Sequence, residues 1–73
     1  MTIANFYSVP STDKWVSTNC ASGKVVIRKV YDPTFQSDTK RVSIDGVKVR
    51  NFDCEWDEMI RNLEAMFVWS VKV

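Results

Sequence analysis

An Asp-Gly pair at residues 45–46 lies between two runs in which apolar and polar residues alternate. This pattern is the strongest short-range indication of a β-hairpin, because a two-residue type I′ loop needs positive φ angles at both positions. In such a hairpin Ile44 faces Val47, and strict alternation gives the ribbon one apolar and one polar face. The predicted apolar face holds Val42, Ile44, Val47 and Val49. The predicted polar face holds Arg41, Ser43, Lys48 and Arg50.

The spacing of apolar residues changes after Phe52 from steps of two to steps of three and four. The residues at the new spacing are Trp56, Met59, Ile60, Leu63, Met66 and Phe67. They form one stripe of an amphipathic helix, which we expect over about residues 54–67. Asp53 is the predicted N-cap, and the acidic side chains that follow it suit the positive end of the helix dipole.

A strand is predicted at residues 24–31, which are rich in β-branched side chains and are bounded by Gly23 and by Asp32-Pro33. A loop should follow over residues 33–38. The extended pattern then resumes at residues 39–44 and leads into the hairpin.

The first 23 residues are less regular. We expect a short strand near residues 2–8 and a turn at 19–23. Between them, residues 14–20 form a strand, or Ser11 or Thr12 caps one helical turn. After the helix, Trp69, Val71 and Val73 alternate with polar residues, which predicts a last strand; a helix that continues to residue 70 is the alternative.

Strands that come first and one helix that comes late predict an α+β fold. We expect a small antiparallel β-sheet of three to five strands with the helix packed on its valine face. A chain of 73 residues is predicted to form a single domain, residues 1–73. A core of this size supplies roughly 3–5 kcal/mol, so a partner or a homodimer would add to its stability.

The composition excludes several kinds of site. The chain has no histidine, and its two cysteines, Cys20 and Cys54, lie far apart, so no metal site is predicted. No glycine-rich loop is present to hold a phosphate, and no cofactor is expected. The first residues show neither a signal peptide nor a membrane span, which predicts a cytoplasmic protein whose thiols are free and partly buried rather than bridged.

No catalytic residue is predicted, and we do not expect an enzyme. The only cluster of carboxylates lies at the predicted start of the helix, where acidic residues suit the helix dipole better than acid-base catalysis. A nucleophile would need a base held beside it, and no pair of residues in the sequence is arranged in that way.

The charges are unevenly divided along the chain, with net +4 over residues 1–52 and net −3 over residues 53–73. On the predicted fold, one sheet face is basic through Arg28, Arg41, Lys48 and Arg50, and the outer helix face is acidic through Glu55, Asp57, Glu58 and Glu64. The alternative is that these charges only keep two exposed surfaces soluble. Tyr31 and Phe52 lie near strand ends, where they would be available to stack on bases. Trp56 is assigned to the core, whereas Trp15 and Trp69 belong to the core or to an interface.

The hairpin at Asp45-Gly46, followed by Arg50, Phe52, Asp53 and an acidic helix, resembles the hairpin-then-helix layout of small phage-encoded inhibitors of the anti-CRISPR type. The likeness covers about a third of the chain and carries no diagnostic motif, so no functional residue is transferred. The resemblance implies that the protein blocks a host nucleic-acid enzyme or surveillance complex by surface contact, in the host cytoplasm.

Three hypotheses follow. In the first, the protein is an inhibitor or adaptor that docks on a larger protein or nucleoprotein complex. In the second, it is a small nucleic-acid-binding module that uses its basic sheet face. In the third, it is a subunit of a homo-oligomer that pairs through Trp69, Val71 and Val73. The candidate contact residues are Glu55, Glu58, Glu64, Arg28, Arg41, Lys48 and Arg50.

Overall fold

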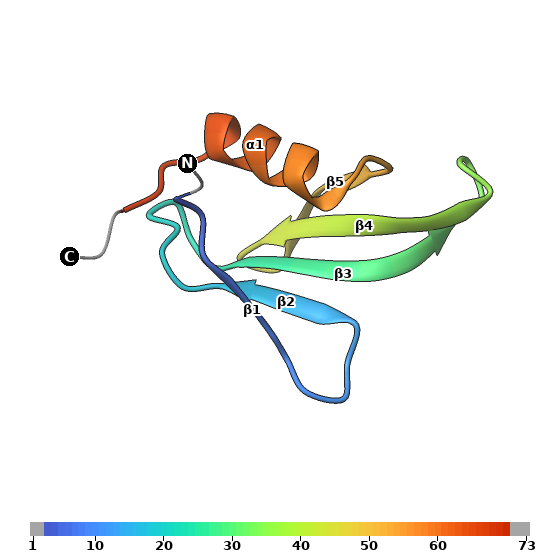
Figure 1. Ribbon diagram of the computed structural model, residues 1–73, viewed down its shortest axis with the longest axis horizontal. Helices are drawn as coiled ribbons and strands as arrows, with labels where there is room; N and C mark the ends of the chain where they lie inside the picture. Colours follow the sequence, from blue (N-terminus) through green and yellow to red (C-terminus); the bar gives the residue numbers. More distant parts are fainter. Residues whose placement is uncertain (1–2, 71–73) are drawn as a thin grey trace.

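The described part of the chain forms one five-stranded antiparallel sheet, whose strands lie in chain order, and one helix (Figure 1). A computed structural model describes residues 3–70. The elements are β1 (Phe6–Ser8), β2 (Lys14–Ser17), β3 (Val25–Asp32), β4 (Ser37–Ile44), β5 (Val47–Phe52) and α1 (Trp56–Met66). The helix lies against one face of the sheet, which confirms the predicted α+β architecture.

The β4–β5 hairpin forms at the predicted place. Asp45 and Gly46 have φ angles of 50° and 83°, as a type I′ loop requires, and Ile44 pairs with Val47. The β3–β4 hairpin is longer, with eight residues in each strand, and its turn extends beyond the N-terminal start of α1 (Figure 1).

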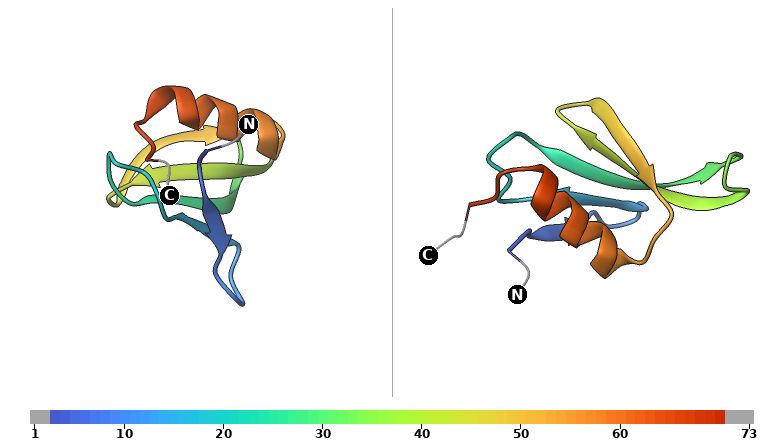
Figure 2. Two further views of the ribbon diagram at one scale, coloured as in Figure 1. Left: turned by 60° about the vertical axis from the view of Figure 1, so that its left-hand side comes forward. Right: turned by 90° about the horizontal axis from the view of Figure 1, so that it is seen from above.

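A β-bulge in β5 makes the predicted faces of this hairpin wrong in part. Lys48 pairs with Ser43, but the next pair is Arg50 with Val42, so Val49 and Arg50 together oppose one residue of β4. Arg50 therefore shares the face of the buried Val42 and not the face of Arg41. At the start of the strand, Val47 remains 67% exposed. Figure 2 shows β5 set at a wide angle to β3 and β4, as expected where a bulge increases the twist.

The N-terminal region contains two short strands. The strand predicted near residues 2–8 is β1, and β2 confirms the strand interpretation of the next segment, although β2 ends at Ser17. The alternative prediction, a helical turn capped by Ser11 or Thr12, is wrong. Ser11 instead has a φ of 63° in the turn between the two strands.

The helix starts and ends close to the predicted positions but is not capped as predicted. Its N-cap is Glu55, which makes no side-chain capping bond, and Asp53 is exposed before it. The helix ends where the Phe67 N–H donates to the Leu63 carbonyl at 3.0 Å. Trp69 is then extended and pairs with Cys20, so a helix to residue 70 is wrong. Val71 and Val73 of the predicted last strand lie outside the described residues.

The core lies between the sheet and α1. Val25, Ile27 and Val42 on the sheet and Met59 and Leu63 on the helix are completely buried. Burial of an aliphatic side chain contributes about 1.5–3 kcal/mol, so these few residues dominate the stability. An aromatic cluster extends the core toward β1, with ring centroids 5.4–6.0 Å apart, and it consists of Phe6, Trp15, Trp56 and Trp69. All three tryptophans therefore belong to the core side.

Asp45 links the hairpin loop to the start of β3. Its carboxylate accepts a hydrogen bond from the Lys24 N–H at 2.9 Å, and its own N–H donates to the Lys24 carbonyl at 2.9 Å. Gly23 lies under this contact with a φ of 148°, and a Cβ there would come within 2.5 Å of the Asp45 carboxylate. Only glycine therefore fits at residue 23.

We expect G23A to destabilise the protein more than G46A does. Both substitutions put alanine at a positive φ angle, 148° at Gly23 and 83° at Gly46, and such sparsely populated conformations cost about 1–3 kcal/mol each. G23A also displaces the Asp45 carboxylate, and the lost hydrogen bond adds roughly 1 kcal/mol. A Cβ added at Gly46 would meet no atom within 4 Å, so its variant carries only the backbone strain and is the matched control. Denaturant unfolding of both variants measures the difference, and equal losses would contradict the role given to Asp45.

Candidate functional site

The sheet face turned away from α1 is the candidate site, and we call it the open face (Figure 2). Within residues 3–70 the only helix packs on the opposite face. The pairing between strands places on the open face Lys14 and Val16 of β2, Val26, Arg28 and Val30 of β3, and Thr39, Arg41 and Ser43 of β4.

Three cations of the open face stand in direct register across three strands. Lys14 pairs with Arg28, Arg28 pairs with Arg41, and Arg41 pairs with Asn51 of β5. We call Lys14, Arg28 and Arg41 the cationic row. Directly opposed side chains in a sheet have Cβ atoms about 4.5–5.5 Å apart, and like charges at that separation destabilise the pair.

The cationic row has no carboxylate partner within residues 3–70. Among the residues that the structure describes, one ion pair is found, between the Lys29 Nζ and the Asp38 Oδ2 at 3.8 Å. Both of these residues lie on the same face as α1, because Lys29 alternates with Arg28 and Asp38 alternates with Thr39. The charge of the row is therefore left for solvent or for a ligand.

Aliphatic side chains lie among the cations. Val16 is only 7% exposed and Thr39 only 1% exposed, although no second layer covers this face within residues 3–70. Long Lys and Arg side chains cover apolar neighbours with their methylene groups while their charged ends reach water. The open face thus combines an apolar floor with charges above it.

The structure divides the four predicted sheet cations. Arg28 and Arg41 belong to the row, and Lys48 lies on the same face opposite Ser43. Arg50 does not lie on this face, because the bulge turns it toward the other one. Its guanidinium carbon instead stands 4.9 Å from the centroid of the Phe52 ring.

A hydrogen bond across β4 shows that the sheet is strongly curled beside the row. The Asn51 Nδ2 of β5 donates to the Asp32 Oδ2 of β3 at 2.7 Å, although these two strands are not neighbours. This bond is the main reason why the pKa of Asp32 is lowered, and a hydrogen bond from the Thr34 N–H lowers it further. The Arg41 Nε and the Asn51 Oδ1 are buried there without a hydrogen-bond partner among residues 3–70.

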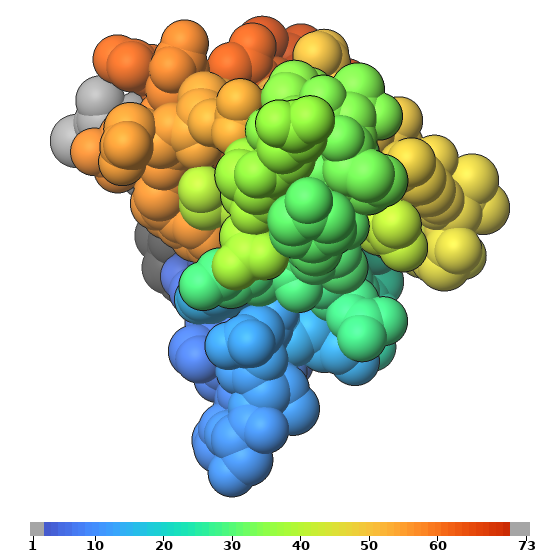
Figure 3. Space-filling view, turned by 90° about the vertical axis from the view of Figure 1, so that its right-hand side faces the viewer, coloured from blue at the N-terminus to red at the C-terminus, as the bar shows by residue number. Residues whose placement is uncertain are grey.

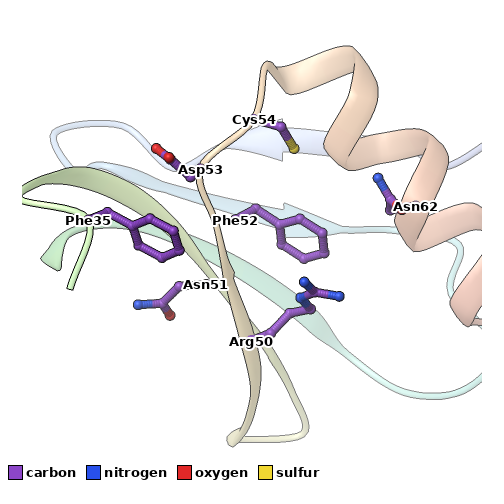
Figure 4. A pocket seen from close by; sticks show the side chains of 7 residues that line it. All are labelled: Phe35, Arg50, Asn51, Phe52, Asp53, Cys54 and Asn62. Atoms are coloured by element: carbon purple, nitrogen blue, oxygen red, sulfur yellow. The ribbon is translucent and has the colours of Figure 1, made fainter.

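A hollow of about 390 Å³ lies at the outer edge of β5, next to the end of the row (Figure 4). Side chains from β5, the β3–β4 turn and α1 line it. On one side of β5 lie Phe35, Asn51 and Asp53, and on the other lie Arg50, Phe52 and Asn62. Phe35 is 46% exposed, so an aromatic ring is available there.

The acidic helix surface is smaller than predicted. Glu55 and Glu58 are exposed, but Glu64 is half-buried and accepts hydrogen bonds from the N–H groups of Ile3 and Ala4, the latter at 2.8 Å. Glu64 thus fixes the N-terminal segment to the helix. The exposed acidic residues of the helix therefore lie only near its first turn.

Several other expectations can be compared with the structure. Cys20 and Cys54 are free and partly buried, as predicted. Phe52 is only 5% exposed and is not available to stack on a base, whereas Tyr31 is 63% exposed. In the described part of the chain, no three His, Cys, Asp or Glu side chains gather in a way that could hold a metal ion. Between residues 3 and 70, no helix has the length and apolar character needed to cross a membrane.

Sequence reasoning missed Lys14, Asn51, Phe35 and Tyr7. Lys14 joins the row only through the pairing of β2 with β3, which no short motif announces. Tyr7, 51% exposed, lies on the open face opposite Val16, in a strand predicted without a register. Asn51 and Phe35 come together because the sheet curls. A polar residue inside an alternating strand was the one available signal for Asn51.

We expect R28Q to stabilise the protein by about 0.5 kcal/mol, because it removes the central charge of three opposed cations. The gain should shrink at high ionic strength, since salt screens exposed charges. R61Q is the matched control: Arg61 follows Asp57 and Glu58 by four and three residues on α1, so its loss should destabilise slightly. Thermal unfolding at low and high salt measures both variants, and a destabilising R28Q would contradict repulsion along the row.

We expect N51A to raise the pKa of Asp32, because the Asn51 amide is the main group that stabilises its carboxylate. A lowered pKa in the folded state stabilises the fold above the ordinary pKa of Asp, and this contribution is lost as the pH falls through the lowered value. The stability difference between wild type and N51A should therefore shrink in acid. NMR titration of the Asp32 carboxyl carbon measures the pKa. N62A is the control, since the Asn62 amide donates to the Glu58 carbonyl instead.

These placements rest on the geometry of the molecule alone. No protein-family model, curated protein or solved structure matches the chain. The open face, the cationic row and the hollow are therefore the observations from which a function has to be inferred.

Proposed function

We propose that this protein is a non-enzymatic binding protein and that the open face is its contact surface for an anionic surface on a larger partner. The observation that carries this proposal is the cationic row, in which three cations stand opposite one another without a carboxylate partner among the described residues. Repulsion between these cations lowers the stability of the free protein, whereas in a complex the same cations would bind an anionic partner.

The row is a poor way to make a sheet face soluble. Alternating positive and negative residues in opposed positions would keep the face in water and would also stabilise the pairing of the strands. Three acidic residues lie close by, but none of them forms an ion pair with the row among the described residues. Asp32 is bound by Asn51, Asp38 pairs on the other face, and Asp13 lines a hollow with Lys14 and Arg28 without pairing with either. The arrangement therefore favours an external anion as the partner of the row.

The residue types of the open face suit a specific contact. Arg28 is exposed, and its planar guanidinium is able to bind a carboxylate or a phosphate with two parallel hydrogen bonds, whereas Arg41 is half-buried and its Nε is covered. Tyr7 stands at the edge of the same face and is half exposed. Tyr and Arg are among the residues most often found at the energetic centres of protein interfaces.

The form of this function that the sequence resemblance implies is an inhibitor or adaptor that blocks a larger nucleic-acid-processing complex. An open face that presents cations would occupy an anionic surface that such a complex needs for its assembly. The exposed acidic residues of α1 and its N-cap lie on the other layer of the molecule and are Glu55, Asp57 and Glu58. They therefore do not take part in the same contact.

The proposal is tested by charge reversal on the two layers. Arg28 and Lys48 are exposed on the open face, and Arg61 is exposed on the helix, so R28E and K48E are compared with R61E as the matched control. Tagged wild type and variants capture partners from a nuclease-treated and an untreated bacterial lysate, at low and high salt. Circular dichroism confirms that each variant is folded.

We expect R28E and K48E to lose the macromolecule that wild type retains, and R61E to keep it. High salt should weaken the capture by wild type, because the contact is between charges. If R28E and K48E capture as wild type does while R61E fails, the open face is not the contact surface and the proposal is wrong.

A further inference from the structure

We propose that the cationic row and the hollow at β5 form one continuous track for a short single-stranded nucleic acid. Phosphates bind the row, and one base stacks on Phe35. This inference rests on the proposed function and names its partner. It also assigns a role to the hollow, which the open face alone leaves unexplained.

The row and the hollow meet at one residue. Lys14, Arg28, Arg41 and Asn51 follow one another across β2, β3, β4 and β5. With neighbouring strands about 4.8 Å apart, this line is about 14 Å long, the length of a few nucleotides. Asn51 is its last member and also lines the hollow. A chain of phosphates laid on the row is thus led to the edge of β5.

The hollow has the chemistry of a base subsite on the side that the row reaches. The Phe35 ring comes from the β3–β4 turn and is 46% exposed, and Asn51 and Asp53 lie on the same side of β5 (Figure 4). Aromatic side chains stack on unpaired bases, and the exposed Asp53 carboxylate is an acceptor for the amino group of a base edge, whereas the Asn51 amide is held by Asp32. A volume of about 390 Å³ leaves room for a base. Figure 3 shows the β3–β4 turn at the end of the molecule, between the β4–β5 hairpin and the β1–β2 turn. A single nucleic-acid strand can reach it there.

Arg50 continues the track past the edge. It lies on the far side of β5 from Asn51, and its guanidinium is held over the Phe52 ring with 4.9 Å between the guanidinium carbon and the ring centroid. The ring supports the guanidinium from one side and leaves its N–H donors for a phosphate. The bulge that removes Arg50 from the open face thus places it where the next phosphate arrives.

The carboxylates beside the track favour nucleic acid over an acidic protein segment. Asp53 lines the hollow and Asp32 lies next to Asn51, so both would repel a carboxylate or a phosphate there, and this part of the track suits the uncharged base of a ligand. A base has no charge and offers amino groups that such acceptors bind. Paired bases inside a duplex cannot reach Phe35, so the ligand has to be single-stranded. A net charge of +1 fits a short contact of this kind better than adsorption of long polyanions.

The test is fluorescence anisotropy with a short labelled oligonucleotide, as single-stranded DNA and RNA and as the matching duplex. We expect wild type to bind the single strand more tightly than the duplex. F35A should weaken binding by roughly tenfold, the usual effect of removing one stacked base. Y31A is the matched control and should bind as wild type does, because Tyr31 is also an exposed aromatic but belongs to the face that carries α1.

Salt dependence separates the two parts of the track. For a single-stranded ligand, log affinity falls linearly with log salt concentration, and each phosphate contact contributes about 0.7 to the steepness of that slope. R28Q should therefore reduce the slope by about 0.7, whereas F35A should lower the affinity and leave the slope unchanged. An F35A variant that binds as tightly as wild type, or a duplex that binds as tightly as the single strand, would overturn the base subsite.

The outcomes also separate this inference from the function on which it rests. If wild type binds no oligonucleotide but R28E loses a protein partner in lysate, the track is wrong and the open face is a contact surface for an acidic protein. If R28E leaves both the captured partner and the affinity for oligonucleotides unchanged, the proposed function and the track fail together.

Discussion

One helix of 11 residues cannot cover both faces of a five-stranded sheet, and this shortage of covering structure governs the rest of the molecule. α1 packs on the face that carries Ile27 and Val42, where burial is complete. The other face has to be kept compatible with water by its own side chains. Long Lys and Arg side chains above buried valine and threonine meet that need. Placing these cations directly opposite one another adds charge repulsion, which lowers the stability of the fold and so is not explained by stability alone. The face that the helix leaves uncovered is therefore the candidate contact surface.

Local signals in the sequence predict much of this fold. The Asp45-Gly46 loop and the helical stripe need only neighbouring residues to form, and both are found where the sequence places them. The bulge in β5 has no such signal, because Val49 and Arg50 continue an alternating pattern that fits an unbroken strand equally well. The helix N-cap was also mispredicted: Asp53 has the right side chain, but the chain turns into the helix two residues later.

The candidate site was only partly predictable, because it depends on which strands pair and in what register. Arg28, Arg41 and Lys48 share a face as their alternation implies. The sequence does not reveal that Arg28 stands between two other cations, since that follows from contacts among three separate strands. Glu64 shows the opposite case. Its spacing on the helix indicates an outer acidic surface, but the N-terminal segment returns to it and uses its carboxylate.

The side chain of Asn19 holds the two ends of the described chain together. Its Nδ2 donates to the carbonyls of Ile3 at 2.6 Å and Ser70 at 2.9 Å, and its Oδ1 accepts from the Asn5 N–H at 2.8 Å. In terms of connectivity, the fold is closed on itself: one buried amide joins residues that lie 67 positions apart in the sequence, from 3 to 70. A domain whose ends meet in this way tolerates circular permutation, with the exposed turn between β1 and β2 as the natural place for new ends. The order of the strands along the chain could thus be changed while the curled sheet and its uncovered face are kept.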